Sequence, residues 1–387
     1  LPAAMQVHEH MVKKSMEVNG PTYVALQKAC TSHANLGQGR EFHKLSDYWD
    51  QFDKPEVGAA IIDMYAKSGG KLEEAHAVFD KLPKNEILPW CALIAAHNHQ
   101  GDMKGALQLF HEMQQAGLKP DVGTYVNALK ASSMMPDVST GIQIHQQIRQ
   151  RGLEADPILG NALIDMYSKC RGWSSAWEVF DEIPERDVAT WNALIGGLTK
   201  HGHCEEALQI FFQMAMEGFY PNDVSYVTIL TACTTLRALE QGKHIHSRIS
   251  KTNASTNTFV TNALVDMYAT CGSLSCASKL FNEMLKRNVV SWNALISGYT
   301  QQGYGYEALH CLEKMLNDGL FPDNGTFQCV LCACGHSGLV DEAQLLFNDM
   351  TNKYGIAPTL EHHTCMVEAF GFVGDFDKAV SMIKVMP

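Results

Sequence analysis

Residues 188–222, VATWNALIGGLTKHGHCEEALQIFFQMAMEGFYPN, predict two short helices joined by a tight turn. The apolar residues of the first helix recur with helical spacing, at Trp191, Leu194, Ile195 and Leu198. Those of the second do the same, at Ala207, Leu208, Phe211 and Met214. Glu205 and Glu206 suit the positive end of the second helix, and Gly218 suits a left-handed helix cap. One such hairpin cannot bury both apolar faces, so it needs neighbours.

The neighbours recur at a fixed interval. Trp90, Trp191 and Trp292 are 101 residues apart, and so are Tyr125, Tyr226 and Phe327 in a second motif. Asp165 and Asp266, in NALIDMY and NALVDMY, keep the same interval, while the upstream copies Tyr23 and Asp63 are offset by 102. The additional residue lies at Gly69-Gly70. A period this regular over most of the chain predicts a helical-repeat solenoid.

The units that we assign fill the chain without a linker. Residues 1–19 match the second helix of a partial repeat, and 20–387 form a single solenoid. Its repeats are 20–54, 55–86, 87–121, 122–156, 157–187, 188–222, 223–257, 258–288, 289–323, 324–359 and a truncated 360–387. Because half a repeat precedes Gly20, we interpret the chain as part of a longer protein whose targeting segment lies outside it.

Composition is that of a globular protein, with 46% hydrophobic and 19% charged residues in 387. The net charge of −12 argues against a general polyanion binder, although a solenoid can keep its acidic residues away from a binding groove. No apolar run is long enough to span a membrane. Cysteines recur by repeat position, as at Cys30, Cys233 and Cys334, so we expect reduced core thiols without disulfides or metal.

The hairpin pattern W-N-A-L-I…E-E-A-L…F…M…G…P-[DN] resembles the pentatricopeptide repeat. The rotation of 35-, 35- and 31-residue units is similar to the plant class that alternates standard, long and short motifs, although two long-like units stand in series at 1–54. The resemblance implies an all-α fold, a right-handed α-solenoid of stacked helix-turn-helix hairpins. It also implies the RNA-recognition segment of an organellar C-to-U RNA editing factor, in mitochondria in preference to chloroplasts.

Catalysis by this chain is not predicted. A zinc deaminase needs His-x-Glu followed by Pro-Cys-x-x-Cys, and the chain offers His203-Cys204-Glu205 and, far downstream, Cys329-Val330-Leu331-Cys332. Gln328 stands where proline is needed, and the two elements fall in different repeats. His43, His145 and His246 share one repeat position and are expected to make packing or polar contacts between hairpins. We expect no cofactor, and any deaminase domain would follow this chain or belong to a partner.

Base recognition is the chemistry that the resemblance implies. An amide both donates and accepts hydrogen bonds, so it can bind the edge of a base, and modular proteins of this type recognise about one base per repeat. The family assigns this role to the fifth and last residues of a unit, which here pair as Asn161/Asp187, Asn192/Asn222, Asn262/Asn288 and Asn293/Asp323. The second residue sandwiches the base, at Ile158, Ala189, Phe259 and Val290. Alternatively, an Asn near a helix start only satisfies backbone groups.

Phosphate contacts are implied at the end of the first helix, at Lys67, Lys169 and Lys200. The long units have Val24, Val126 and Val227 at the fifth position, which cannot bind a base edge and could hold an accessory editing protein. The predicted partner is single-stranded organellar RNA, and the alternative function is a protein-interaction scaffold. By the family's code, the units from 157 to 323 select U, C or U, any base, C or U, and U, from 5′ to 3′.

Overall fold

The computed structural model describes residues 10, 11, 14, 19–48, 54–135, 138–170 and 172–386. Most of the partial repeat predicted at 1–19 lies outside these residues. The described chain is all-helical and contains no strand, which confirms the all-α prediction. It divides into two compact units, Leu1–Gly197 and Leu198–Pro387.

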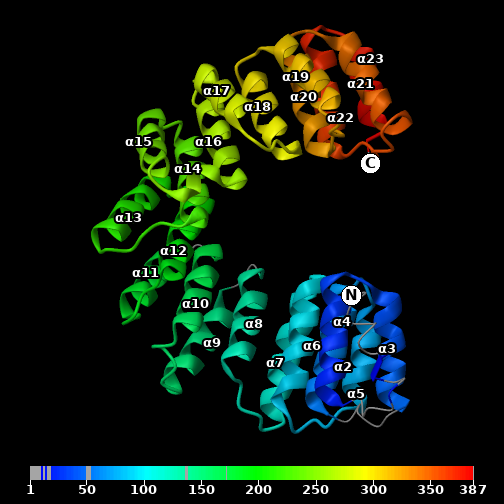
Figure 1. The fold of residues 1–387 in the computed structure, drawn as a ribbon, viewed down its shortest axis with the longest axis vertical. Helices are drawn as coiled ribbons and strands as arrows, with labels where there is room; N and C mark the ends of the chain where they lie inside the picture. Colours follow the sequence, from blue (N-terminus) through cyan, green and yellow to red (C-terminus); the bar gives the residue numbers. More distant parts are fainter. Residues whose placement is uncertain are drawn as a thin grey trace. The chain divides into compact units, whose positions relative to one another are not determined.

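The first unit is a row of hairpins (Figure 1). Its helices are α2 (Gly20–Ser32), α3 (Leu36–Tyr48), α4 (Pro55–Lys67), α5 (Leu72–Lys81), α6 (Ile87–Gln100), α7 (Met103–Gln115), α8 (Val122–Ser133), α9 (Ser139–Gln150), α10 (Pro157–Lys169) and α11 (Trp173–Glu182). Helix α12 (Val188–Lys200) begins in this unit and ends in the second.

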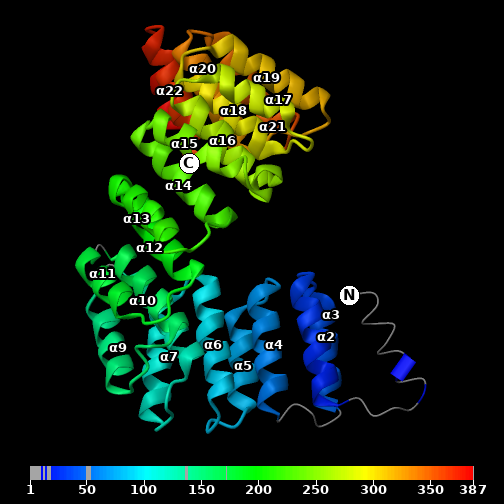
Figure 2. The same ribbon diagram turned by 60° about the vertical axis from the view of Figure 1, so that its left-hand side comes forward.

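The second unit repeats the arrangement (Figure 2). Its helices are α13 (Cys204–Met216), α14 (Asp223–Leu236), α15 (Leu239–Ile249), the 3-10 turn η1 (Asn253–Thr256), α16 (Thr258–Thr270), α17 (Leu274–Glu283), α18 (Val289–Gln301), α19 (Gly305–Asn317), α20 (Asn324–His336), α21 (Val340–Asn352), α22 (Leu360–Phe372) and α23 (Phe376–Lys384). Every even-numbered helix starts at the first residue of a repeat as we assigned the repeats from the sequence.

Within each unit, a first helix packs against its own second helix and against the first helix of the next repeat. In the first unit, α4 contacts α5 and α6; in the second, α18 contacts α19 and α20. The predicted helical stripes of residues 188–222 are confirmed, because Trp191 and Phe211 are fully buried. Gly218 has φ of 88°, so it adopts the left-handed conformation predicted for it.

An aromatic pair joins successive hairpins at the 101-residue interval. Phe180 at the end of α11 meets Trp191 on α12 edge-to-face, with ring centroids 4.8 Å apart. One cycle later, Phe281 on α17 meets Trp292 on α18 at 4.5 Å. Such contacts add to the free energy gained by burying the rings, so each hairpin stabilises its neighbour.

The histidines that share a repeat position make polar contacts between hairpins, as predicted. In three successive cycles, Nδ1 of the histidine and the hydroxyl oxygen of a tyrosine on the next first helix share a hydrogen bond of 2.9 Å: His43–Tyr65, His145–Tyr167 and His246–Tyr268. The sequence interval between partners is 22 residues in every case. These histidines therefore hold repeats together, and no group of three metal-binding side chains occurs among the described residues.

Candidate nucleic-acid interface

The last residue of a unit is the N-cap of the next first helix. Asp187, Asn222, Asn288 and Asp323 each accept, through Oδ1, a hydrogen bond from the backbone N–H three residues on. A helix start leaves its first N–H groups without partners inside the helix, and Asp and Asn are favoured there because they satisfy one of them. The cap fixes these side chains at the N-terminus of the helix. The second polar atom of each side chain, Nδ2 of Asn or Oδ2 of Asp, takes no part in the cap bond.

Asn293 and Asp323 form one hydrogen-bonded group. Asn293 Nδ2 donates to Asp323 Oδ1 at 3.0 Å. The Thr326 hydroxyl approaches both side-chain oxygens, at 2.7 Å from Asn293 Oδ1 and 2.9 Å from Asp323 Oδ1. The pKa of Asp323 is lowered: burial would raise it, but the bonds from the Thr326 N–H, Asn293 and the Thr326 hydroxyl together outweigh burial. The carboxylate is therefore ionised at neutral pH, with Oδ2 outside this group.

Asn262 and Asn288 are also in contact, but Asn262 is more enclosed. Asn262 Nδ2 lies 3.4 Å from Asn288 Oδ1, and the Ser291 hydroxyl donates to Asn262 Oδ1 at 2.7 Å. Asn262 is only 6% exposed. The sequence interpretation, in which this amide stands open toward a base, missed the serine that occupies its oxygen.

The two remaining predicted pairs are placed differently. Asn161 lies half-buried on α10, and its Oδ1 is buried without a hydrogen-bond partner among the described residues. Asp187 caps α12 and bonds the Thr190 hydroxyl at 2.9 Å. The pair Asn192/Asn222 is divided between the two compact units, so its members are described separately: Asn192 is half-buried on α12, and Asn222 caps α14.

The predicted sandwiching residues are exposed although three of them are large and apolar. Ile158 is 61% exposed, Phe259 73% and Val290 58%, and Ala189 is exposed too. Two residues at the same repeat position were missed by the sequence interpretation, Leu88 and Val224, which are 46% and 58% exposed. Both are the second residue of their unit, so this repeat position could have identified them from the sequence. An exposed apolar side chain therefore recurs at the second position of several units, at Leu88, Ile158, Val224, Phe259 and Val290.

In the second unit, these features meet in one groove of about 460 Å³. Phe259 and Asn262 line it from α16, Val290 and Asn293 from α18, and Val227 from α14. The groove therefore brings two predicted sandwiching residues and two predicted base-edge residues together, with a long-unit valine beside them. Apolar walls with a few polar side chains are typical of a site that takes a flat, partly polar ligand.

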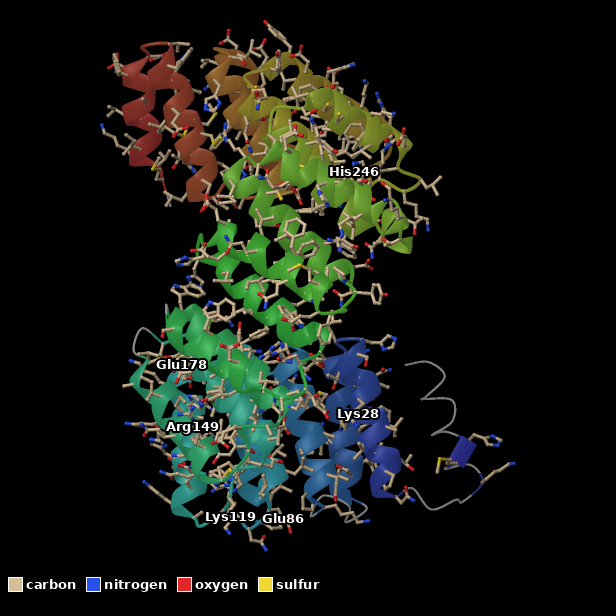
Figure 3. The ribbon with its side chains drawn as sticks, turned by 90° about the vertical axis from the view of Figure 1, so that its left-hand side faces the viewer. Lys28, Glu86, Lys119, Arg149, Glu178 and His246 are labelled. Atoms are coloured by element: carbon tan, nitrogen blue, oxygen red, sulfur yellow. A yellow bond between two sulfur atoms is a disulfide. The ribbon has the colours of Figure 1, made fainter. Side chains whose placement is uncertain are left out.

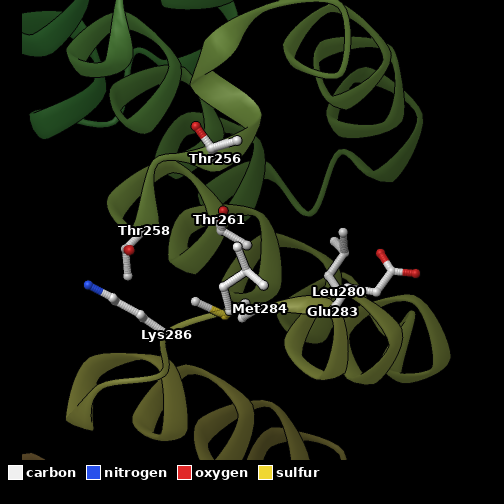
Figure 4. A pocket seen from close by; sticks show the side chains of 8 residues that line it. Thr256, Thr258, Thr261, Leu280, Glu283, Met284 and Lys286 are labelled. Atoms are coloured by element: carbon white, nitrogen blue, oxygen red, sulfur yellow. The ribbon is translucent and has the colours of Figure 1, made fainter.

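A separate cavity of about 410 Å³ lies at the start of α16 and the end of α17 (Figure 4). Thr258, Thr261, Glu283 and Lys286 are among its lining residues. None of the residues predicted to contact RNA lines it, so we do not place base recognition there.

The predicted phosphate-contacting lysines differ in their partners. Lys67 Nζ lies 2.7 Å from Asp63, and Lys169 Nζ lies 2.6 Å from Asp165, both four residues earlier on the same helix. Lys200, at the end of α12, is exposed and has glycine four residues before it. Exposed pairs of this spacing are worth about 0.3–0.5 kcal/mol, which applies to the exposed Lys67 more closely than to the half-buried Lys169.

Charge is concentrated on the second helices. Helices α18 and α20 contain no Asp, Glu, Lys or Arg, and α16 contains only Asp266. By contrast, α11 alone holds three acidic residues, among them Glu178 (Figure 3). Arg149 of α9 forms an ion pair with Glu182 of α11. Most of the acidic residues that give the chain its net negative charge therefore lie outside the helices that line the groove.

One prediction about cysteines is wrong. The sequence interpretation expected free thiols throughout, but Cys332 of α20 and Cys365 of α22 form a disulfide. Their Cα atoms are 5.2 Å apart, within the range that a disulfide spans. The expectation rested on cysteines that recur at one repeat position, such as Cys30, Cys233 and Cys334, and neither Cys332 nor Cys365 is one of these. Because Cys332 is bonded to Cys365, it is not available as the zinc ligand of a deaminase motif.

Both compact units are thus rows of helical hairpins, the architecture of an α-helical repeat protein. Models of the PPR repeat family match residues 90–133, 186–235 and 287–336, and models of the PPR repeat match 161–188, 259–289, 325–354 and 361–387. These matches together span more than half of the chain. The chain belongs to the pentatricopeptide repeat family.

Relatives from Arabidopsis thaliana cover the whole chain. Pentatricopeptide repeat-containing protein At4g30700 is 34% identical over 99% of this chain and 48% of its own length. The protein At2g03880, labelled mitochondrial, is 34% identical over 100% of this chain and 60% of its own length. The chain thus spans roughly half of these relatives. Among solved structures, PPR10 from maize is similar, with 18% identity, 99% of this chain and 70% of that chain covered, and a TM-score of 0.42.

Proposed function

We propose that this chain binds single-stranded RNA in a sequence-specific manner, with about one base per repeat. The observation that supports this most directly is the groove of the second unit. It combines exposed Phe259 and Val290, which can stack on bases, with Asn262 and Asn293, which can bind base edges. The pentatricopeptide family also includes a protein solved with an 18-nt RNA element.

Within this proposal, each base lies between the second residues of two successive units, and the fifth and last residues contact its edge. Phe259 and Val290 would enclose the base of unit 258–288, whose edge faces Asn262 and Asn288. Stacking of a base on an aromatic side chain such as Phe259 is worth about 1–3 kcal/mol and is tolerant of sequence, so the polar pair determines the choice of base. Lys200 would attract the phosphates, with Lys67 and Lys169 joining once they leave their carboxylate partners.

We further propose that the chain is the recognition segment of an organellar C-to-U RNA editing factor of the plant class with standard, long and short motifs. The lengths of the units support this assignment, and two of the relatives are labelled mitochondrial. A deaminase domain would follow this chain or belong to a partner. An accessory editing protein would bind the long units, where Val227 borders the groove. No helix in the described part of the chain has the length and apolarity needed to cross a membrane.

Selection from a random RNA pool tests the proposal. We expect enrichment of RNAs with the pattern U, pyrimidine, any base, pyrimidine, U, from 5′ to 3′, and little retention of duplex RNA. Equal retention of single- and double-stranded RNA without an enriched pattern would contradict sequence-specific binding. Retention of proteins alone would favour the interaction scaffold.

A further inference from the structure

Asp266 lies on α16 one turn beyond Asn262 and lines the same groove. Residues four apart on a helix face the same side, so the two side chains are neighbours. Since α18 and α20 carry no Asp, Glu, Lys or Arg, Asp266 is the single such residue on these three helices. It is half-buried, and burial raises its pKa.

The equivalent carboxylates elsewhere in the chain are neutralised. Asp63 pairs with Lys67 at 2.7 Å and Asp165 pairs with Lys169 at 2.6 Å. In the unit of Asp266, Thr270 takes the place of the lysine, and among the described residues Asp266 has neither an ion pair nor a side-chain hydrogen bond. One substitution thus leaves a carboxylate without a partner inside the groove. A buried charge of this kind costs free energy unless a ligand supplies a donor.

The chemistry of the carboxylate limits what it can bind. An ionised carboxylate only accepts hydrogen bonds, and it repels phosphates. Among pyrimidines, cytosine presents an amino group at N4, whereas uracil presents a carbonyl oxygen at O4, which a carboxylate also repels. The pair Asn262/Asn288 accepts either pyrimidine, so it leaves this choice open.

We propose that Asp266 makes the unit 258–288 select cytosine over uracil, by accepting a hydrogen bond from the N4 amino group. The inference rests on the proposed RNA-binding function. It adds a third specificity-determining residue to this unit, and it assigns no such role to Asp165, whose carboxylate already has a lysine partner.

The test measures affinity for four RNAs that differ only at the base expected opposite unit 258–288. We expect the wild-type chain to prefer C over U by about ten- to a hundredfold, the effect of one hydrogen bond to a charged group. Asp266→Ala and Thr270→Lys should both bring the ratio of C to U affinity to about one. Thr270→Lys does so by restoring the ion pair seen at Asp165 and Lys169. The matched control, Asp165→Ala, should leave the ratio unchanged.

The outcomes separate this inference from the proposed function. Equal binding of C and U by the wild type, with pyrimidines still preferred at other positions, would overturn the role of Asp266 alone. Asp266→Ala weakening all four RNAs equally would also overturn it, since a structural role predicts that result. Absence of base preference at every position would instead reject the proposed function. Far-ultraviolet circular dichroism and thermal unfolding show whether each variant is folded. If Asp266→Ala does not fold, Thr270→Lys tests the same inference.

Discussion

Asn293 Nδ2 donates a hydrogen bond of 3.0 Å to Asp323 Oδ1, so the fifth residue of one repeat is joined to the residue that caps the next. The two side chains are 30 positions apart in sequence and act as one polar group. Preorganisation of this kind reduces the entropy lost when a base binds, because neither side chain needs to be ordered at that moment.

Replacement of Asn293 by alanine should weaken binding at one base only. Loss of its edge contact should cost on the order of 1–3 kcal/mol for the preferred base and relax the preference there. Filter binding with RNAs substituted at that position measures the effect. Asn317→Ala, an exposed residue of the second helix α19, is the matched control and should change nothing. Equal weakening on every RNA would show that Asn293 only supports the fold.

Replacement of Lys200 should weaken binding on all RNAs to the same extent. A lysine that contacts phosphate releases a counterion, so Lys200→Ala should lower the slope of log affinity against log salt by about 0.7 for a single strand. Titrations at four salt concentrations measure this slope. The control is Lys279→Ala on the second helix α17. An unchanged slope, or a loss confined to particular bases, would contradict a phosphate contact.

Stability should decrease as the pH falls below about 6.5, the pKa of histidine in an unfolded chain. Burial lowers the pKa of His145 and His246, so the unfolded chain binds protons at these sites before the folded one does. Their stabilising effect is complete above pH 6.5 and is lost as the pH falls through their lowered pKa. Urea unfolding at pH 7.5 and 5.5 measures it. His246→Leu should reduce the difference in the free energy of unfolding between pH 7.5 and pH 5.5. His310→Leu, at an exposed site, should leave that difference unchanged.

The disulfide between Cys332 and Cys365 should stabilise the oxidised protein. Closing a loop across 33 residues contributes on the order of 3 kcal/mol by restricting the unfolded chain. Cys332→Ser should therefore lower the urea midpoint of oxidised protein and have little effect in reductant. Peptide mapping without reduction should recover the cross-linked pair. The exposed control Ser275→Ala on α17 should behave like the wild type in both conditions. Identical midpoints for wild type and Cys332→Ser under oxidation would be inconsistent with the bond.

Much of the fold could be predicted from the sequence because repetition makes local patterns reliable. The stripe that begins at Trp191 specifies one helix face, and its copy at Trp292 repeats the signal. The placement of the base-recognition side chains could be predicted less well. The Ser291 hydroxyl that occupies Asn262 depends on how two successive first helices approach each other, which periodicity alone does not give. Cys332 and Cys365 meet for the same reason. The pairing of Lys169 with Asp165, by contrast, follows from their spacing of four and was open to prediction.

The most direct test of sequence-specific RNA recognition is the affinity of the wild-type chain for single-stranded RNAs carrying each base at the five positions opposite units 157–187 to 289–323. Base recognition predicts uracil at the first and fifth positions, pyrimidines at the second and fourth, and indifference at the third. Purines bound as tightly as pyrimidines at the first and fifth positions would contradict it.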